Sequence, residues 1–117
     1  AKVLSNLIES SNRNTVCMAV PVEELGDMEF DLIINSTSTG LSDTALPIPN
    51  AIFAKNSLAY EMMYGRETPF MAQARANGAH VADGLGMLVE QAAEAFYIWR
   101  GLRPETAPVI EILRNCN

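Results

Sequence analysis

The longest amphipathic pattern in the chain lies between Asp83 and Gly101. Two glycines, Gly84 and Gly86, begin this stretch, and neither Gly nor Pro occurs again before Gly101. Within it, apolar residues recur at helical spacing: Leu85, Leu88, Val89, Ala92, Phe96 and Trp99. We therefore predict a helix that buries this face in the core.

The opposite side of the predicted helix is more polar. It carries Met87, Glu90, Glu94 and Tyr97, while Gln91 lies at the border of the apolar face. Because the helix follows a glycine-rich loop, the Gln91 amide could reach a ligand at the helix mouth. The alternative is a helix packed on a sheet with Gln91 merely half-exposed. The pattern by itself leaves both readings open.

Shorter apolar runs predict strands earlier in the chain. Residues 15–20 and 57–61 form two such runs, and residues 79–82 form a short extended piece. The clearest strand is 30–35, where Leu-Ile-Ile in sequence predicts burial on both faces, as in parallel sheets covered by helices. Strands that alternate with helices predict an α/β fold with a parallel sheet.

Capping residues and helix breakers locate the remaining helices. Thr68 is a favoured N-cap and Pro69 a favoured first residue, so a helix is expected to continue from there to about Asn77. A last helix is expected to begin at Pro104 or Glu105. Further helical segments are expected at residues 1–8, 22–25 and 51–54.

Composition and charge exclude several classes of function. The 117 residues suit one domain, and a net charge of −6 with scattered Lys and Arg argues against a nucleic-acid partner. The apolar runs are too short to cross a bilayer, and no secretory signal is visible. Cys17 and Cys116 lack metal-ligand spacing, so we expect reduced thiols in a cytoplasmic protein with no metal site.

The loop after the strand at 30–35 is a candidate ligand wall. It is small, polar and rich in hydroxyls, reading Asn35-Ser36-Thr37-Ser38-Thr39-Gly40. In open α/β sheets, ligands bind beyond the carboxyl ends of the strands. A polar loop without function explains the composition equally well, so the loop alone leaves both readings open.

Several motifs then occur in a specific order. After the strand comes Asn-x-Thr-x-x-Gly, followed by Tyr-acid-Met-x-Tyr and Thr-Pro-Phe, then Asp-Gly-Leu-Gly-Met-Leu-Val-x-Gln-Ala-Ala and Trp-Arg-Gly. Together they resemble the C-terminal portion of shikimate dehydrogenase, and the resemblance extends from about Ala1 to Leu113. One motif alone would be a weak signal, whereas several in register are specific.

The resemblance implies an NADP-dependent oxidoreductase that converts 3-dehydroshikimate to shikimate. It implies a partial Rossmann-like, three-layer α/β fold that lacks the first βα unit with its glycine loop. Residues 1–117 would be the C-terminal part of the NADP-binding domain, including the C-terminal helices at about 83–114, with the N-terminal substrate domain absent. Because the family's Lys/Asp pair lies in that absent domain, we expect no catalytic residue here and no activity of the chain alone.

The resemblance also implies roles for individual residues. Tyr64 would donate its hydroxyl toward the substrate carboxylate, and Gln91 would bond a substrate hydroxyl. Glu61 stands where Asp is common, and no ligand contact is expected of it. His80 and Arg13 are expected to be structural or at the surface. The cofactor-binding positions would be Asn35, Ser36, Thr37, Ser38, Met62, Gly84 and Met87, the last also lining the substrate cleft.

Two alternatives remain open. One is a quinate/shikimate dehydrogenase that prefers NAD, since the discriminating residues lie outside this chain. The other is a non-catalytic module that binds a nucleotide or metabolite. In each case the partner is a small molecule. A sheet without its first strands has an unpaired edge, so we also expect the chain to be marginally stable or to self-associate.

Overall fold

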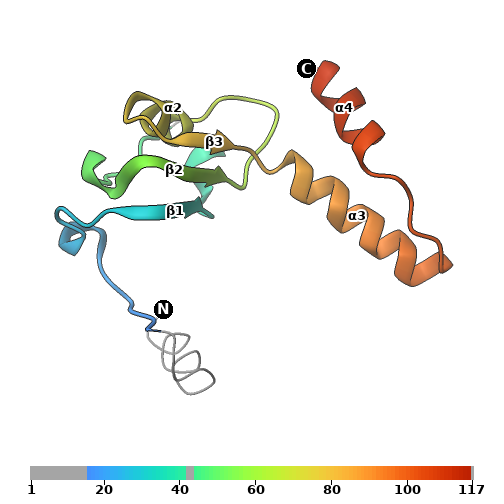
Figure 1. The fold of residues 1–117 in the computed structure, drawn as a ribbon, viewed down its shortest axis with the longest axis horizontal. Coiled ribbons are helices and arrows are strands. Elements are labelled where there is room, and N and C mark those ends of the chain that lie inside the picture. Colours follow the sequence, from blue (N-terminus) through green and yellow to red (C-terminus); the bar gives the residue numbers. More distant parts are fainter. Residues whose placement is uncertain (1–15, 42–43, 117) are drawn as a thin grey trace.

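The computed structural model describes residues 16–41 and 44–116. Within these ranges, three strands and three helices follow one another (Figure 1); one 3-10 turn precedes the first strand, and two lie between the first and second strands. The expected helix at residues 1–8 and the turn with Arg13 lie outside the described residues. The elements in order are η1 (Val22–Glu24), β1 (Phe30–Asn35), η2 (Ser38–Leu41), η3 (Asn50–Ile52), β2 (Phe53–Glu61), α2 (Pro69–Ala76), β3 (His80–Ala82), α3 (Leu85–Arg100) and α4 (Ala107–Asn115).

The strands form a parallel sheet in the order β1-β2-β3, which confirms the predicted class. Leu32 lies opposite Leu58, and Leu58 lies opposite His80. β2 begins at Phe53, four residues earlier than expected, and contains an irregularity. Its pairing with β1 shifts between Phe30 and Leu32, and Asn56 lies nearby with a φ of 63°. Such an irregularity is typical of a β-bulge, and it lies in the first half of β2, just after η3.

One face of the sheet packs against α2, and this contact forms the core. Phe70, Met71 and Ala74 of α2 are buried against Ala59 of β2, and the Phe70 ring lies 5.9 Å from that of Phe53. The predicted start of the helix is confirmed, because Thr68 accepts a hydrogen bond from the Met71 amide and Pro69 follows it. The apolar side of α2 is therefore buried against the sheet.

The other face of the sheet is open in the described part of the chain. Leu32 and Ile34 of β1 remain 52% and 57% exposed, and Leu58 of β2 is exposed beside them. The predicted burial of β1 on both faces is therefore wrong for these residues. α2 covers only the side that carries Ile33 and Ala59, and no described element packs on the opposite side.

The strand predicted at residues 15–20 is not formed in its described part, residues 16–20. The backbone there is irregular, and Val16 and Met18 are exposed. An extended apolar segment becomes a strand only when another strand offers its free N–H and C=O groups. Among the described strands, β1 pairs with β2 alone, so its other edge remains open.

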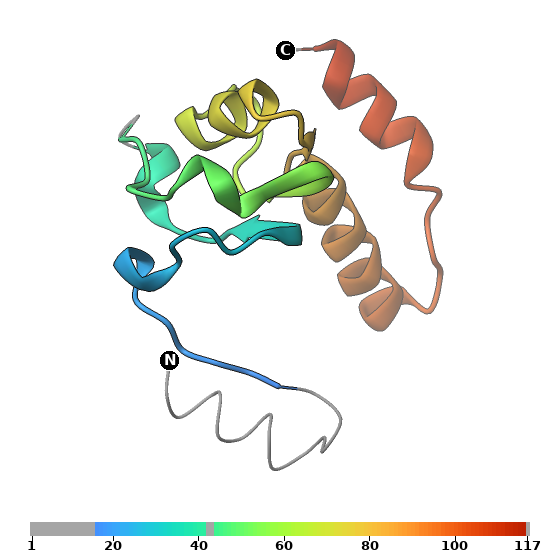
Figure 2. The same ribbon diagram turned by 60° about the vertical axis from the view of Figure 1, so that its left-hand side comes forward.

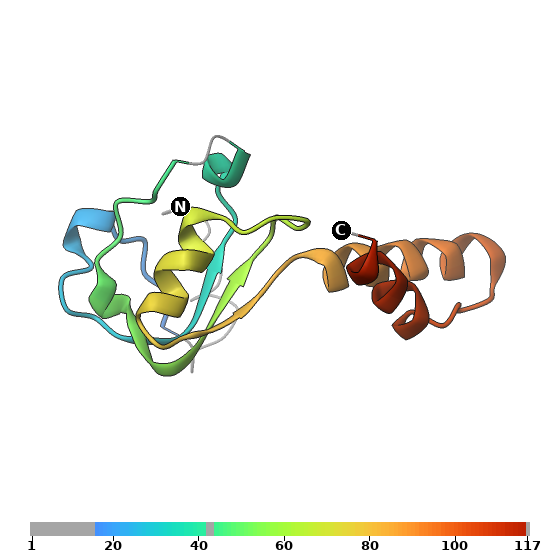
Figure 3. The ribbon, with the colours of Figure 1, turned by 90° about the horizontal axis from the view of Figure 1, so that it is seen from above.

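The helices α3 and α4 form an arm that leads away from the sheet (Figures 1 and 3). Gly101 ends α3 with a φ of 70°, and its amide donates to the Tyr97 carbonyl at 2.8 Å. The overall radius of gyration is 17.0 Å, against about 13 Å for a compact domain of roughly 100 residues. The arm contributes to this extended shape.

The predicted burial of the apolar face of α3 is only partly correct. Leu85 and Val89 are buried at the start of the helix, but Leu88, Ala92 and Phe96 are exposed. Trp99, expected to pack in the core, is 77% exposed. The reason is geometric: α3 begins at the sheet but does not lie on it, so only its first turns reach the sheet (Figure 3), and Ala93 further along is buried in the groove toward α4.

The last helix begins later than expected. Residues 102–106 are irregular, and α4 starts at Ala107 rather than at Pro104 or Glu105. Thr106 at its N-cap position donates its hydroxyl to the Glu90 carboxylate of α3 at 2.6 Å instead of capping the helix. No helix in the described ranges is long and apolar enough to span a membrane.

Candidate functional site

Main-chain hydrogen bonds join the segments that follow the three strands. The Met62 amide donates to the Asn35 carbonyl at 3.1 Å, and the Gly84 amide donates to the Met63 carbonyl at 3.0 Å. The strands end on the same side of the sheet, next to the start of α3 (Figure 2). We name the surface formed by residues 35–39, 62–64 and 83–87 the carboxyl edge. Parallel sheets bind ligands at such an edge.

A buried carboxylate lies beneath the carboxyl edge. Glu61, the last residue of β2, has 0% relative exposure. Its Oε2 accepts hydrogen bonds from Asn35 Nδ2 at 2.7 Å and from Thr68 Oγ1 at 2.9 Å, and its Oε1 accepts one from the Met63 amide at 3.1 Å. A buried charge is tolerated when several donors satisfy it. Glu61 therefore connects β1, the turn after β2 and the start of α2.

Sequence reasoning missed this role of Glu61, although a signal was present. Ser57, Ala59 and Glu61 alternate along β2, and all three are buried on the face that α2 covers. A period of two in a strand places such residues on one face. The acid at the end of this series was therefore predictable as a core position.

Asn35 holds the loop that follows β1. Its side chain is buried, and its Oδ1 accepts hydrogen bonds from the Thr37 amide at 3.1 Å and the Thr37 hydroxyl at 2.8 Å. Thr37 and Thr39 share a further hydroxyl–hydroxyl hydrogen bond of 2.7 Å. Ser36 and Ser38 are exposed. Of the four predicted loop residues, Asn35 thus faces the protein interior, and the other three lie at the surface.

Gly84 is required by packing inside the protein. A Cβ atom built on this residue would lie 2.1 Å from the Met62 carbonyl oxygen and 2.7 Å from its carbonyl carbon. No side chain fits against a backbone at that distance. Gly84 is itself buried, and its φ of −76° is ordinary for any residue. Gly84 was expected to border the nicotinamide, which stays a prediction; in the described structure the group that lies against it is the Met62 carbonyl.

The remaining predicted site residues surround this packed centre. Met62 and Tyr64 follow β2 and are 40% and 47% exposed. Met87 is half-buried and Gln91 is exposed, on successive turns of α3. Asp83 fixes the start of α3, because its Oδ1 accepts a hydrogen bond from the Leu85 amide at 3.4 Å. Tyr64 and Gln91 therefore present polar groups to solvent from two segments that meet at Gly84.

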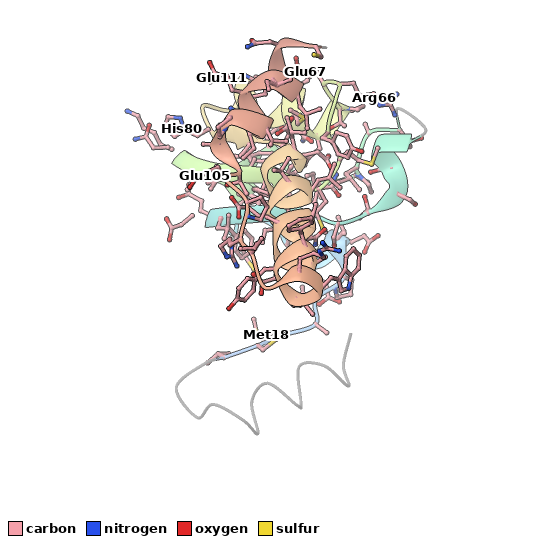
Figure 4. All side chains as sticks on the ribbon, turned by 90° about the vertical axis from the view of Figure 1, so that its right-hand side faces the viewer. Met18, Arg66, Glu67, His80, Glu105 and Glu111 are labelled. Atoms are coloured by element: carbon pink, nitrogen blue, oxygen red, sulfur yellow. The ribbon has the colours of Figure 1, made fainter. Side chains whose placement is uncertain are left out.

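The described residues also contain an apolar cavity, the single histidine of the sequence and both cysteines. An apolar cavity of ≈ 340 Å³ lies at β1, lined mainly by aliphatic residues and reaching the carboxyl edge only at Asn35 and Thr37. His80 lies at the surface (Figure 4), in agreement with its expected position. Cys17 and Cys116 are free, and the described residues contain no group of three His, Cys, Asp or Glu placed to hold a metal.

Comparisons with known proteins show which family the chain resembles. Residues 84–114 match the family described as Shikimate 5'-dehydrogenase C-terminal domain. The chain is 64% identical over 93 residues to a shikimate dehydrogenase (NADP(+)) of Methylobacillus flagellatus. That match covers 79% of this chain and 34% of the relative. The chain is related to the C-terminal portion of the shikimate dehydrogenases.

Solved structures agree with this relationship and with the predicted Rossmann-like α/β class. The crystal structure of an Ael1 enzyme from Pseudomonas putida has a TM-score of 0.83 and 40% identity, covering 97% of this chain and 42% of that chain. Shikimate 5-dehydrogenase from Thermus thermophilus, in complex with shikimate, has a TM-score of 0.65 and 34% identity, covering 84% and 36%. The chain thus spans about a third of the curated shikimate dehydrogenase that it matches.

Proposed function

We propose that residues 1–117 form the part of an NADP-dependent shikimate dehydrogenase that contacts the nicotinamide half of the cofactor. One observation carries the proposal: 64% identity, over 79% of the chain, to an enzyme named for that activity and cofactor. Residues 1–117 would be the C-terminal part of the cofactor domain, with the C-terminal helices at about 83–114. The reaction would be the reduction of 3-dehydroshikimate to shikimate by NADPH.

The carboxyl edge would contact the nicotinamide half of the cofactor. The loop from Ser36 to Ser38 is held by Asn35, and Met62 packs against Gly84, so both segments are fixed before any ligand arrives. Prearranged groups lose less entropy when a ligand binds. Met87 would line the same cleft from α3. Asn35 would act by shaping the loop, since its side chain is buried.

Tyr64 and Gln91 would bind the substrate. A phenol and a carboxamide can hold a carboxylate and hydroxyls without adding charge. Both side chains are exposed in the described structure, and they come from the turn after β2 and from α3. The similarity to an enzyme crystallised with shikimate supports this class of substrate. Quinate as substrate with NAD as cofactor is the alternative.

The chain alone is expected to be catalytically inactive. Its match covers 34% of the curated relative, and the resemblance places the family's Lys/Asp pair outside these residues. We also propose a cytoplasmic location, in keeping with biosynthetic relatives.

We further propose that the chain self-associates at the open edge and the open face of the sheet. Leu32 and Ile34 expose apolar surface beside the unpaired edge of β1, which favours contact with a second sheet.

Turnover tests the proposal. The protein encoded by the complete reading frame that contains these 117 residues, called the complete protein below, is mixed with shikimate and NADP⁺. NADPH formation is then followed by absorbance. We expect turnover by the complete protein and none by the chain alone. Faster turnover with quinate and NAD⁺ would support the alternative dehydrogenase, and nucleotide binding without turnover would support the binding module.

Two tyrosines with equal exposure test the substrate assignment. Tyr64 and Tyr97 are both 47% exposed, but Tyr97 lies far along α3 beneath the Arg103 guanidinium. Tyr64→Phe in the complete protein is expected to raise KM for shikimate about tenfold or more, because a hydrogen bond to a carboxylate is lost. Tyr97→Phe should leave KM unchanged. Equal KM values of the two variants for shikimate would show that Tyr64 does not bind the substrate.

A further inference from the structure

We propose that Glu61 is a positioning residue for the cofactor site. This inference rests on the proposed function and assigns a role that the motif resemblance did not give to the acid. Glu61 would touch neither cofactor nor substrate, since its side chain is completely buried. Its carboxylate would instead fix the two main-chain segments that line the nicotinamide, the loop after β1 and the turn after β2.

The first connection passes through Asn35. Because Asn35 Nδ2 donates to Glu61 at 2.7 Å, the amide oxygen must point in the opposite direction, toward Thr37. There it accepts from both the amide and the hydroxyl of Thr37. An Asn side chain that lost its carboxylate partner could rotate and present its NH₂ group to the loop. Glu61 therefore sets which atom of Asn35 faces Thr37.

The second connection is direct. Glu61 Oε1 accepts the Met63 amide at 3.1 Å, which fixes the turn that carries Met62 and Tyr64. The Met62 carbonyl in this turn is the group against which Gly84 packs. One carboxylate thus holds the turn in the position that the start of α3 requires. The two segments predicted to border the nicotinamide share one anchor.

The third donor shows why a carboxylate is needed here. Thr68 Oγ1 donates to Glu61 Oε2 and accepts from the Met71 amide, so the hydroxyl is used in both directions. All three partners donate, and a carboxylate accepts at both oxygens. A carboxamide cannot do this. In one orientation its NH₂ meets the Met63 amide, and in the other it meets Asn35 Nδ2, so a donor faces a donor in each case.

Amide exchange and cofactor affinity test this role together. Glu61→Gln in the 117-residue chain is expected to speed hydrogen exchange at the Thr37 and Met63 amides about tenfold, the equivalent of one hydrogen bond. Exchange at the Ala59 amide, inside the sheet, should change less than about twofold.

In the complete protein, the same substitution should raise KM for NADP⁺ about tenfold. Glu67→Gln, at an exposed acid paired with Arg75, is the matched control and should change neither quantity.

A second variant covers the case in which Glu61→Gln does not fold. Glu61→Asp keeps the charge and both acceptors on a shorter side chain, so it should shift exchange and KM in the same direction but by about threefold. Exchange that stays unchanged at Thr37 and Met63, or that rises equally at Ala59, would overturn the positioning role. Faster local exchange with an unchanged KM for NADP⁺ would overturn it too. Absence of turnover in the unsubstituted complete protein would instead reject the proposed function, and the exchange rates would still report on Glu61.

Discussion

Two amphipathic helices in this chain, α2 and α3, differ in how much of their apolar face is buried. α2 has eight residues and buries Phe70, Met71 and Ala74 against the sheet. α3 has sixteen residues and the longer apolar pattern, yet Phe96 and Trp99 are exposed on its later turns. The difference lies in what each helix faces: α2 lies on the sheet, whereas α3 leaves it (Figure 3). Helical periodicity identifies a face that suits burial, but it does not show that the same stretch of chain supplies the partner.

Polar contacts hold the arm formed by α3 and α4. Arg103 forms ion pairs with Glu90 and Glu94, and Thr106 bonds Glu90. These side chains are about half exposed, so each ion pair contributes little to stability. Only a small apolar groove lies between the two helices, lined by Val89, Phe96 and their neighbours. The sheet region is thus stabilised by its buried core, whereas the arm combines exposed polar contacts with the burial of Val89 and Ala93.

The largest expected effect compares two phenylalanines, one in each helix. Phe70→Ala empties a buried site beside Phe53 and is expected to lower the free energy of unfolding of the chain by about 3–5 kcal/mol. Phe96→Ala should cost less than about 1 kcal/mol, because its side chain is 44% exposed. Urea unfolding monitored by circular dichroism measures both. Equal losses would mean that α3 packs as tightly as α2, against the contrast drawn above.

A glycine pair tests the junction between the two regions. Gly84→Ala places a methyl group against the Met62 backbone and is expected to cost about 3 kcal/mol. Gly86, in the first turn of α3, has open space at its Cβ, so Gly86→Ala should stabilise the helix by about 0.5–1 kcal/mol. Thermal or urea unfolding gives both values. A harmless Gly84→Ala would show that α3 can shift away from Met62 without cost.

The smallest expected effect concerns the exposed ion pairs of the arm. Arg103→Gln removes the pairs with Glu90 and Glu94 and the contact above the Tyr97 ring. It should lower stability by less than about 1 kcal/mol at low salt, and the difference should fall further in about 1 M NaCl because salt screens exposed charges. Unfolding curves at two salt concentrations measure it. A loss that is large and independent of salt would show that Arg103 acts through burial instead.

The sequence predicted those parts of the fold that depend on local signals. Thr68 and Pro69 correctly located the start of α2, Gly101 the end of α3, and the run at 30–35 the first strand. Expectations that depended on distant partners failed. Residues 16–20 have strand-like composition but no described strand to pair with, and Trp99 has an apolar side chain but no core beside it.

For the candidate site, the sequence supplies a prediction of its members but not of their physical organisation. The motif order pointed to the loop at Asn35, to Met62 and to Gly84, and the structure joins these segments by main-chain hydrogen bonds. The motif order did not reveal that Asn35 faces inward toward Glu61, since that contact joins residues 26 positions apart. The requirement for glycine at position 84 likewise depends on the Met62 carbonyl, which only the folded chain brings beside it.

Mapping the nicotinamide half of the cofactor onto the chain tests the central proposal most directly. Nicotinamide mononucleotide is titrated into the ¹⁵N-labelled 117-residue chain, and amide chemical shifts are followed. We predict that the shifts concentrate on the carboxyl edge, at Ser36, Ser38, Met62 and Gly84, and that the amides of α4 do not move. Shifts confined to the arm or to the apolar cavity at β1, or no response at the carboxyl edge, would contradict the account.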